Sequence, residues 1–106
     1  MSISAFIQNP QNDEEESFSV PVASENTFAQ RWEPIIEELE LQWLPLFSSG
    51  IDLDEIDLKD VLAELDQFKS AYIDKYGNDE VIERADLLSN SLRKVFSRSG
   101  LKVFIG

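Results

Sequence analysis

The sequence predicts a two-layer α+β fold, in which a small, mostly antiparallel sheet is covered by about three helices in the order β-β-α-α-α-β. Alternating apolar residues near the N-terminus and a β-rich run at the C-terminus predict the strands. Three stretches with apolar residues at three- and four-residue spacing predict the helices. The chain has 106 residues, which suffices for one core but not for two, so residues 1–106 are expected to form a single domain.

An N-terminal hairpin should provide the first two strands, at residues 2–8 and 17–23. The apolar positions that alternate with polar ones are Ile3, Ala5 and Ile7 in the first run, and Phe18, Val20 and Val22 in the second. Pro21 has no N–H to donate to a ladder, so the second strand should lie at an edge and the first strand at the centre of the sheet. Residues 101–106 should add a third strand, whose direction stays open.

The first helix should begin within Ser24 to Thr27, because Thr27 and Gln30 have the spacing of a capping box. Its apolar face comprises Phe28, Trp32, Ile35, Ile36 and Leu39. Pro34 lies inside this pattern and removes a backbone hydrogen bond, so we expect a kink there. The alternative is a separate turn at residues 28–33, with the main helix starting at Pro34. The helix should end near Leu44, since Pro45 disfavours its continuation.

The strongest helical pattern runs from Asp57 to Gly77. Its apolar face comprises Leu58, Val61, Leu62, Leu65, Phe68, Tyr72 and Tyr76. Asp57 should cap the start of this helix, and Gly77 should adopt the left-handed conformation after its end.

The last helix should begin at a cap on Asn78 and end at Gly100. Its apolar face comprises Val81, Ile82, Ala85, Leu88, Leu92, Val95 and Phe96. Only Gly77 and Asn78 separate it from the preceding helix, so the two should pack as an antiparallel hairpin. A small basic cluster at its end suits the negative end of the helix dipole and internal pairing with the acidic body: Arg93, Lys94, Arg98 and Lys102.

The composition excludes several kinds of chemistry. The chain has no cysteine, which excludes disulfides and thiolate sites, and no histidine, the commonest general base near neutral pH. Carboxylate pairs could perform acid–base chemistry, but the sequence shows no recognisable site, so we expect no enzymatic activity and no cofactor. The apolar runs are far too short to span a bilayer, and the N-terminus lacks the features of a secretory signal, so we expect a cytoplasmic protein that does not bind membranes.

The charge is large and unevenly distributed. The net charge is −12, from 21 acidic and 9 basic residues, and residues 1–66 hold 16 of the acidic residues but only 2 of the basic ones. An acidic surface repels phosphate backbones and attracts basic proteins. We therefore expect no nucleic acid as a partner, and either a basic protein partner or a surface whose charge serves solubility alone.

Two acidic segments are the candidate partner-binding residues. The first is Asp13, Glu14, Glu15 and Glu16, and the second is Asp52, Asp54, Glu55 and Asp57. The first segment could equally be a solvated loop, and the second could serve as helix caps and dipole partners. Closely spaced carboxylates at 52–60 also suggest a Ca²⁺ or Mg²⁺ site, but the calcium-loop pattern fails, because Asp57 stands where Gly is needed and Ala63 where Glu is needed.

Several short segments resemble those of small, acidic immunity proteins from bacterial toxin–immunity systems. These segments are Trp32, L-E-L-Q-W-L-P-L at 39–46, Gly50-Ile51, A-E-L at 63–65 and V-F-I-G at 103–106. The resemblance implies a single cytoplasmic domain that binds and neutralises a cognate toxin. It transfers no functional residue, because the family has no catalytic signature.

The leading hypothesis is therefore an immunity-type inhibitor that binds a basic toxin by steric and electrostatic complementarity, as a monomer or a weak homodimer. The first alternative is a non-catalytic structural or adaptor domain that self-associates through the apolar segment 43–47. The second alternative is the carboxylate metal-binding site at residues 52–60.

Overall fold

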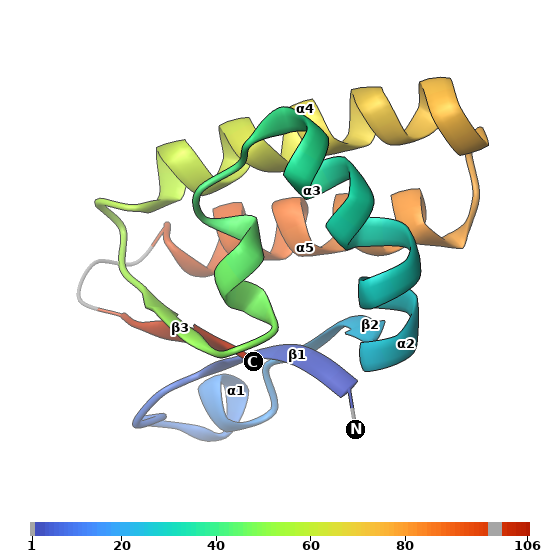
Figure 1. Cartoon of the computed structure of the whole chain (residues 1–106). Coiled ribbons are helices and arrows are strands. Elements are labelled where there is room, and N and C mark those ends of the chain that lie inside the picture. Colours follow the sequence, from blue (N-terminus) through green and yellow to red (C-terminus); the bar gives the residue numbers. More distant parts are fainter. Residues whose placement is uncertain (1, 98–100) are drawn as a thin grey trace.

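The computed structural model describes residues 2–97 and 101–106 and confirms the two-layer α+β fold (Figure 1). The described strands form one antiparallel sheet in the order β2-β1-β4-β3. Their bounds are β1 at Ser2–Ile7, β2 at Ser19–Ser24, β3 at Ile51–Leu53 and β4 at Val103–Ile105. In Figure 1 the sheet lies at the bottom of the molecule, and helices cover its upper face.

The helical segments follow the predicted order with two short additions. The long helices α4, Leu58–Tyr76, and α5, Glu80–Val95, form the predicted antiparallel hairpin. The shorter segments are α1 at Asp13–Glu16, α2 at Glu25–Thr27, the π-helical turn η1 at Phe28–Trp32, α3 at Glu33–Leu39 and the 3₁₀ turn η2 at Leu44–Phe47. The sequence pattern predicted neither α1, which has only four residues, nor η2.

The sheet confirms the predicted roles of the first two strands. β1 lies between β2 and β4, and β2 with its Pro21 lies at an edge. β4 pairs antiparallel with β1, and Phe6 lies opposite Phe104. This pairing gives the direction of the C-terminal strand, which the sequence left open. The fourth strand, β3, was missed, because three residues within an acidic linker are too few to show a period of two.

The core lies between the inner face of the sheet and the helices. Inner-face residues of the sheet such as Ala5, Val103 and Ile105 are completely buried. The helices contribute a series of buried aromatic side chains: Phe28, Trp32, Phe68 and Tyr72. Trp32 stacks on Phe28 and Phe68 in this series, as the predicted core position of Trp32 requires. The predicted apolar face of α5 packs against β2, whereas that of α4 packs against α3 and α5 on the side away from the sheet.

The first helix accommodates Pro34 by a local change of winding. Pro34 lies in the first turn of α3, directly after η1, where the N–H of Glu33 donates to the carbonyl of Phe28, five residues earlier. A π-helical turn of this kind absorbs the hydrogen bond that proline cannot make. The alternative, a separate turn followed by a helix that starts at Pro34, is therefore confirmed to within one residue, because η1 covers Phe28–Trp32 and α3 begins at Glu33.

The predicted helix start at Ser24 to Thr27 is confirmed, but the predicted capping box at Thr27 and the predicted end were wrong. Ser24 is the cap, since its Oγ accepts from the N–H of Thr27 at 3.0 Å. The helix ends at Leu39 rather than near Leu44, because Glu40 adopts a left-handed conformation with φ of 54°.

The caps of the long helices also differ from prediction. Asp57 makes no side-chain cap bond to α4, and its Oδ2 instead accepts from the N–H of Asp54 at 3.2 Å. Gly77 has the expected positive φ, 87°, although its extended ψ differs from that of a left-handed helix. Asp79, not Asn78, caps α5, accepting from the N–H of Val81 at 2.9 Å. The predicted stop at Gly100 lies outside the described residues.

Tyr72 joins the two long helices through the same cap. Its hydroxyl donates to the second carboxylate oxygen of Asp79 at 2.8 Å, and its side chain is completely buried. Burial, followed by the hydrogen bond to Asp79 and the charge of Asp79, raises the pKa of Tyr72 to about 12. The phenol is therefore held in its neutral form well into the alkaline range.

We expect stability to fall between pH 10 and pH 12 partly because of Tyr72. The unfolded chain releases this proton near pH 10 while the folded protein holds it to about pH 12, so the stabilisation is complete below pH 10 and is lost above it. Tyr72→Phe should reduce this alkaline loss, measured by urea unfolding at each pH. Tyr76→Phe is the control, and an equal alkaline loss in the Tyr72→Phe variant and the wild type would contradict the prediction.

Candidate functional site

The predicted acidic loop at 13–16 is a capped helical turn. The Oδ1 of Asn12 accepts from the N–H of Glu15 at 2.8 Å, and the carboxylate of Glu15 accepts from the N–H of Gln11 at 3.1 Å and from Nδ2 of Asn12 at 3.3 Å. This reciprocal arrangement resembles a capping box, with asparagine in place of serine. The spacing of Asn12 and Glu15 could have revealed this turn in the sequence.

Glu15 therefore serves the fold and is not an exposed contact. Its side chain is buried, with 7% of its surface exposed, which corrects its predicted role in partner binding. Asp13, Glu14 and Glu16 are exposed around it. The cap thus holds the backbone of the turn that carries these three exposed carboxylates.

Asn12→Ala should destabilise α1 by about 1 kcal/mol, the usual cost of losing a side-chain cap. Because the turn is small, the effect should appear as faster hydrogen exchange at the amides of Glu15 and Glu16 rather than as global unfolding. Glu16→Gln is the control, since Glu16 is exposed. Unchanged exchange in the Asn12→Ala variant would contradict a structural role for the cap.

The second acidic segment forms a turn between β3 and α4. Asp52 accepts a hydrogen bond from Nε2 of Gln8, and Asp54 accepts from the N–H of Ile56 at 3.0 Å. Asp57 accepts from Asp54 in turn, and Glu55 is exposed. Across residues 2–97 and 101–106, no three acidic side chains lie together as a set of metal ligands.

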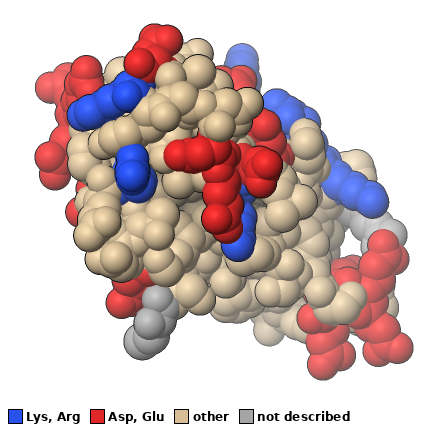
Figure 2. Space-filling view, turned by 90° about the vertical axis from the view of Figure 1, so that its right-hand side faces the viewer, with Lys and Arg blue, Asp and Glu red and all other residues tan. Residues whose placement is uncertain are grey.

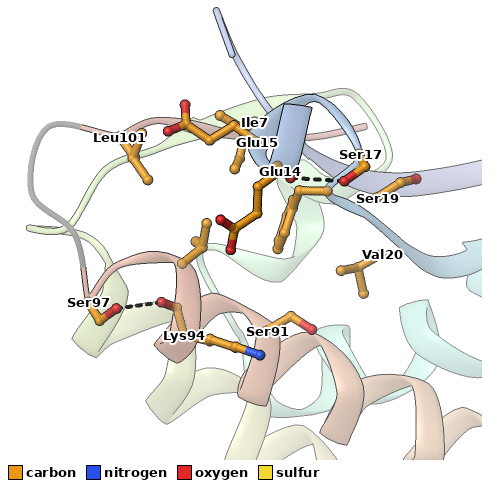
Figure 3. Close-up of a pocket in the computed structure, with 12 residues that line it drawn as sticks. Ile7, Glu14, Glu15, Ser17, Ser19, Val20, Ser91, Lys94, Ser97 and Leu101 are labelled. Atoms are coloured by element: carbon orange, nitrogen blue, oxygen red, sulfur yellow. Dashed lines mark hydrogen bonds between the residues drawn. The ribbon is translucent and has the colours of Figure 1, made fainter. Parts of the chain in front are cut away.

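A cavity of about 450 Å³ lies beside α1 (Figure 3). The lining residues come from β1, from α1 through the start of β2, from the last turns of α5 with Ser97 just after it, and from Leu101 before β4. They are Ile7, Glu14, Glu15, Ser17, Phe18, Ser19, Val20, Ser91, Lys94, Val95, Ser97 and Leu101. Ile7 and Val20 are buried beneath it, and Phe18, Val95 and Leu101 are partly exposed. These five apolar residues form what we call the floor of the cavity, and the other seven lining residues are polar or charged.

The rim of this cavity carries charge of both signs. Glu14 and Glu15 approach it from α1, and Lys94 and Ser91 approach it from α5, as Figure 3 shows. Two serine hydroxyls stabilise the adjoining backbone, since Ser17 donates to the carbonyl of Glu14 at 3.0 Å and Ser97 donates to that of Lys94 at 2.7 Å. The fold thus brings part of the predicted basic cluster close to the acidic run. Arg98 of that cluster lies outside the described residues.

The remaining acidic charge is dispersed. Figure 2 shows acidic side chains in separate groups on one face, with basic side chains between them. The ion pairs seen in the described part of the chain join Lys69 to Asp66 at 3.3 Å and to Asp86 at 2.8 Å, and Arg84 to Glu80 at 3.3 Å. Such exposed pairs contribute little to stability.

A second, smaller groove of about 290 Å³ lies beside α3, and the sequence analysis missed it. Glu33, Glu37 and Glu40 line it together with Leu41 and Pro45. The helical spacing of the three glutamates was the available indication in the sequence.

Most side chains of the apolar segment 43–47 are buried in the core. Leu44 and Phe47 are completely buried and Trp43 is partly buried, whereas Leu46 is 42% exposed. Little apolar surface therefore remains there for self-association.

No family model, curated protein or solved structure matches this chain. In the described parts of the chain, no helix is both long and apolar enough to cross a membrane.

Proposed function

We propose that this protein is a non-catalytic binding module that neutralises a basic protein partner in the cytoplasm, in the manner of an immunity protein. The observation that supports the proposal best is the position of α1, whose exposed Glu14 lines a cavity that also has apolar side chains in its lining. Protein interfaces combine these two features, since a desolvated apolar centre supplies affinity and a charged rim supplies specificity.

The overall charge supports the same proposal. A net charge of −12 on 106 residues attracts a basic protein over a distance and raises the rate of encounter. The resemblance to immunity proteins suggests that the partner is a toxin, which the bound module would block sterically. Neither electrostatic attraction nor steric block needs catalytic residues.

The proposed contacts are the exposed members of the two acidic segments: Asp13, Glu14 and Glu16 on α1, Asp52 in β3, and Glu55 in the turn before α4. Glu15, Asp54 and Asp57 instead stabilise local structure through hydrogen bonds to the backbone.

Co-purification with the product of the adjacent gene tests the proposal. We expect a stable complex and rescue of any toxicity that the neighbouring protein causes when it is expressed alone. The absence of both would contradict the proposal.

A charge-neutralised variant tests the contribution of α1 to that complex. Asp13→Asn, Glu14→Gln and Glu16→Gln together should weaken binding about tenfold or more, mainly through slower association. The matched control combines Glu38→Gln, Asp60→Asn and Asp74→Asn, which removes the same charge from exposed positions elsewhere. An equal loss of affinity in both variants would assign the effect to net charge and not to α1.

A further inference from the structure

Resting on the proposed function, we infer that the cavity beside α1 receives one apolar side chain of the partner, and that a basic residue of the partner next to it lies over α1. The cavity volume, about 450 Å³, falls in the range typical of ligand pockets and exceeds the small gaps of ordinary packing.

The floor of the cavity selects an apolar occupant. Phe18, Val95 and Leu101 are partly exposed and pack against the core, so an apolar side chain above them would cover surface that otherwise contacts water. Leucine or phenylalanine would extend the packing that Ile7 and Val20 begin.

The rim sets the orientation of the occupant. The carboxylates of α1 lie on one side and the Lys94 side chain on the other, as Figure 3 shows for the cavity-lining residues. A basic residue beside the apolar one is attracted toward α1 and repelled by Lys94. The partner segment should therefore be basic on one side of its apolar residue and uncharged or acidic on the other.

The site is also held in shape before binding. The cap between Asn12 and Glu15 holds the start of α1, and Ser17 holds its end by donating to the carbonyl of Glu14. A pre-organised site loses less conformational entropy on binding, which suits a short anchoring segment.

Fluorescence anisotropy with labelled synthetic peptides tests this inference. The probe contains a lysine pair, a leucine–phenylalanine pair and then serines, and in its control serines replace the leucine–phenylalanine pair. We expect the probe to bind at least about tenfold more tightly than the control peptide, since only the probe can bury a large apolar side chain in the cavity.

Two protein variants assign the binding to the cavity. Ser91→Trp should fill the cavity from α5 and weaken binding of the probe peptide about tenfold. Asn90→Trp is its control, because Asn90 lies on the same helix but does not line the cavity, and it should leave the affinity unchanged. Lys94→Glu leaves the floor intact and should strengthen binding of the lysine-containing probe, which keeps the test open if Ser91→Trp fails to fold.

Three outcomes would overturn the inference. The two peptides could bind equally, neither peptide could bind, or the Lys94→Glu variant could bind the probe no more tightly than the wild type. The complex with the product of the adjacent gene is measured separately. A stable complex alongside equal peptide binding would therefore reject the cavity as an anchor site while leaving the proposed function standing.

Discussion

Replacing Trp32 with alanine is expected to lower the free energy of unfolding by about 3–5 kcal/mol, the usual cost of truncating a large buried aromatic side chain. Trp32 is completely buried and lies between Phe28, with ring centroids 5.5 Å apart, and Phe68, at 4.2 Å. It therefore connects the π-helical turn to α4, and its loss leaves a cavity between layers that the rigid helices cannot close.

Urea unfolding followed by circular dichroism measures this loss. Leu46→Ala is the control, because Leu46 is 42% exposed and should cost about 1 kcal/mol or less. If Trp32→Ala does not fold, Trp32→Phe should, at a smaller cost, because it keeps an aromatic ring and removes an indole N–H that has no hydrogen-bond partner among the described residues. A loss for Trp32→Ala no larger than that for Leu46→Ala would contradict the central role of this side chain.

Glu64→Ala should destabilise the protein by about 2–4 kcal/mol, because it leaves three backbone donors without their acceptor. The carboxylate of Glu64 accepts from the N–H groups of Gln42 at 2.8 Å, Trp43 at 2.8 Å and Leu44 at 3.1 Å. These donors lie at the start of η2, so a side chain of α4 acts as the cap of that turn and fixes the whole connection after α3.

Amide hydrogen exchange distinguishes this role from a general loss of stability. Exchange at Trp43 and Leu44 should accelerate in the Glu64→Ala variant beyond the change expected from global unfolding. Glu64→Gln should retain part of the protection, since one acceptor oxygen remains. Asp60→Ala, an exposed substitution on the same helix, is the control, and equal effects of the two alanine substitutions would refute the capping role.

The elements that the sequence predicts well are those whose pattern is local. Val61, Leu65, Phe68 and Tyr72 repeat at helical spacing, and they are the buried face of α4. Pro21 marks an edge strand because of its own covalent structure, and the position of β1 inside the sheet follows.

The features that escaped prediction depend on contacts between distant residues. Glu64 lies twenty or more residues from the amides that it caps, and nothing in its own segment distinguishes it from an exposed glutamate. The cavity depends on the approach of α1 to the last turns of α5, which no sequence window contains. Glu15 differs, because its hydrogen-bond partners Gln11 and Asn12 are local in the sequence. It was nevertheless predicted as an exposed contact, because it lies within a run of four acidic residues.

The two outer strands of the sheet have a consequence for how this protein meets other molecules. β2 carries Pro21 and an irregular register opposite Ile3 and Ser4, and β3 has only three residues, with the charged Asp52 in the middle. Neither strand offers a long row of unpaired backbone groups on which a foreign strand could extend the sheet. We therefore expect the protein to resist fibril growth at high concentration and to recognise its partner through side chains, without strand exchange.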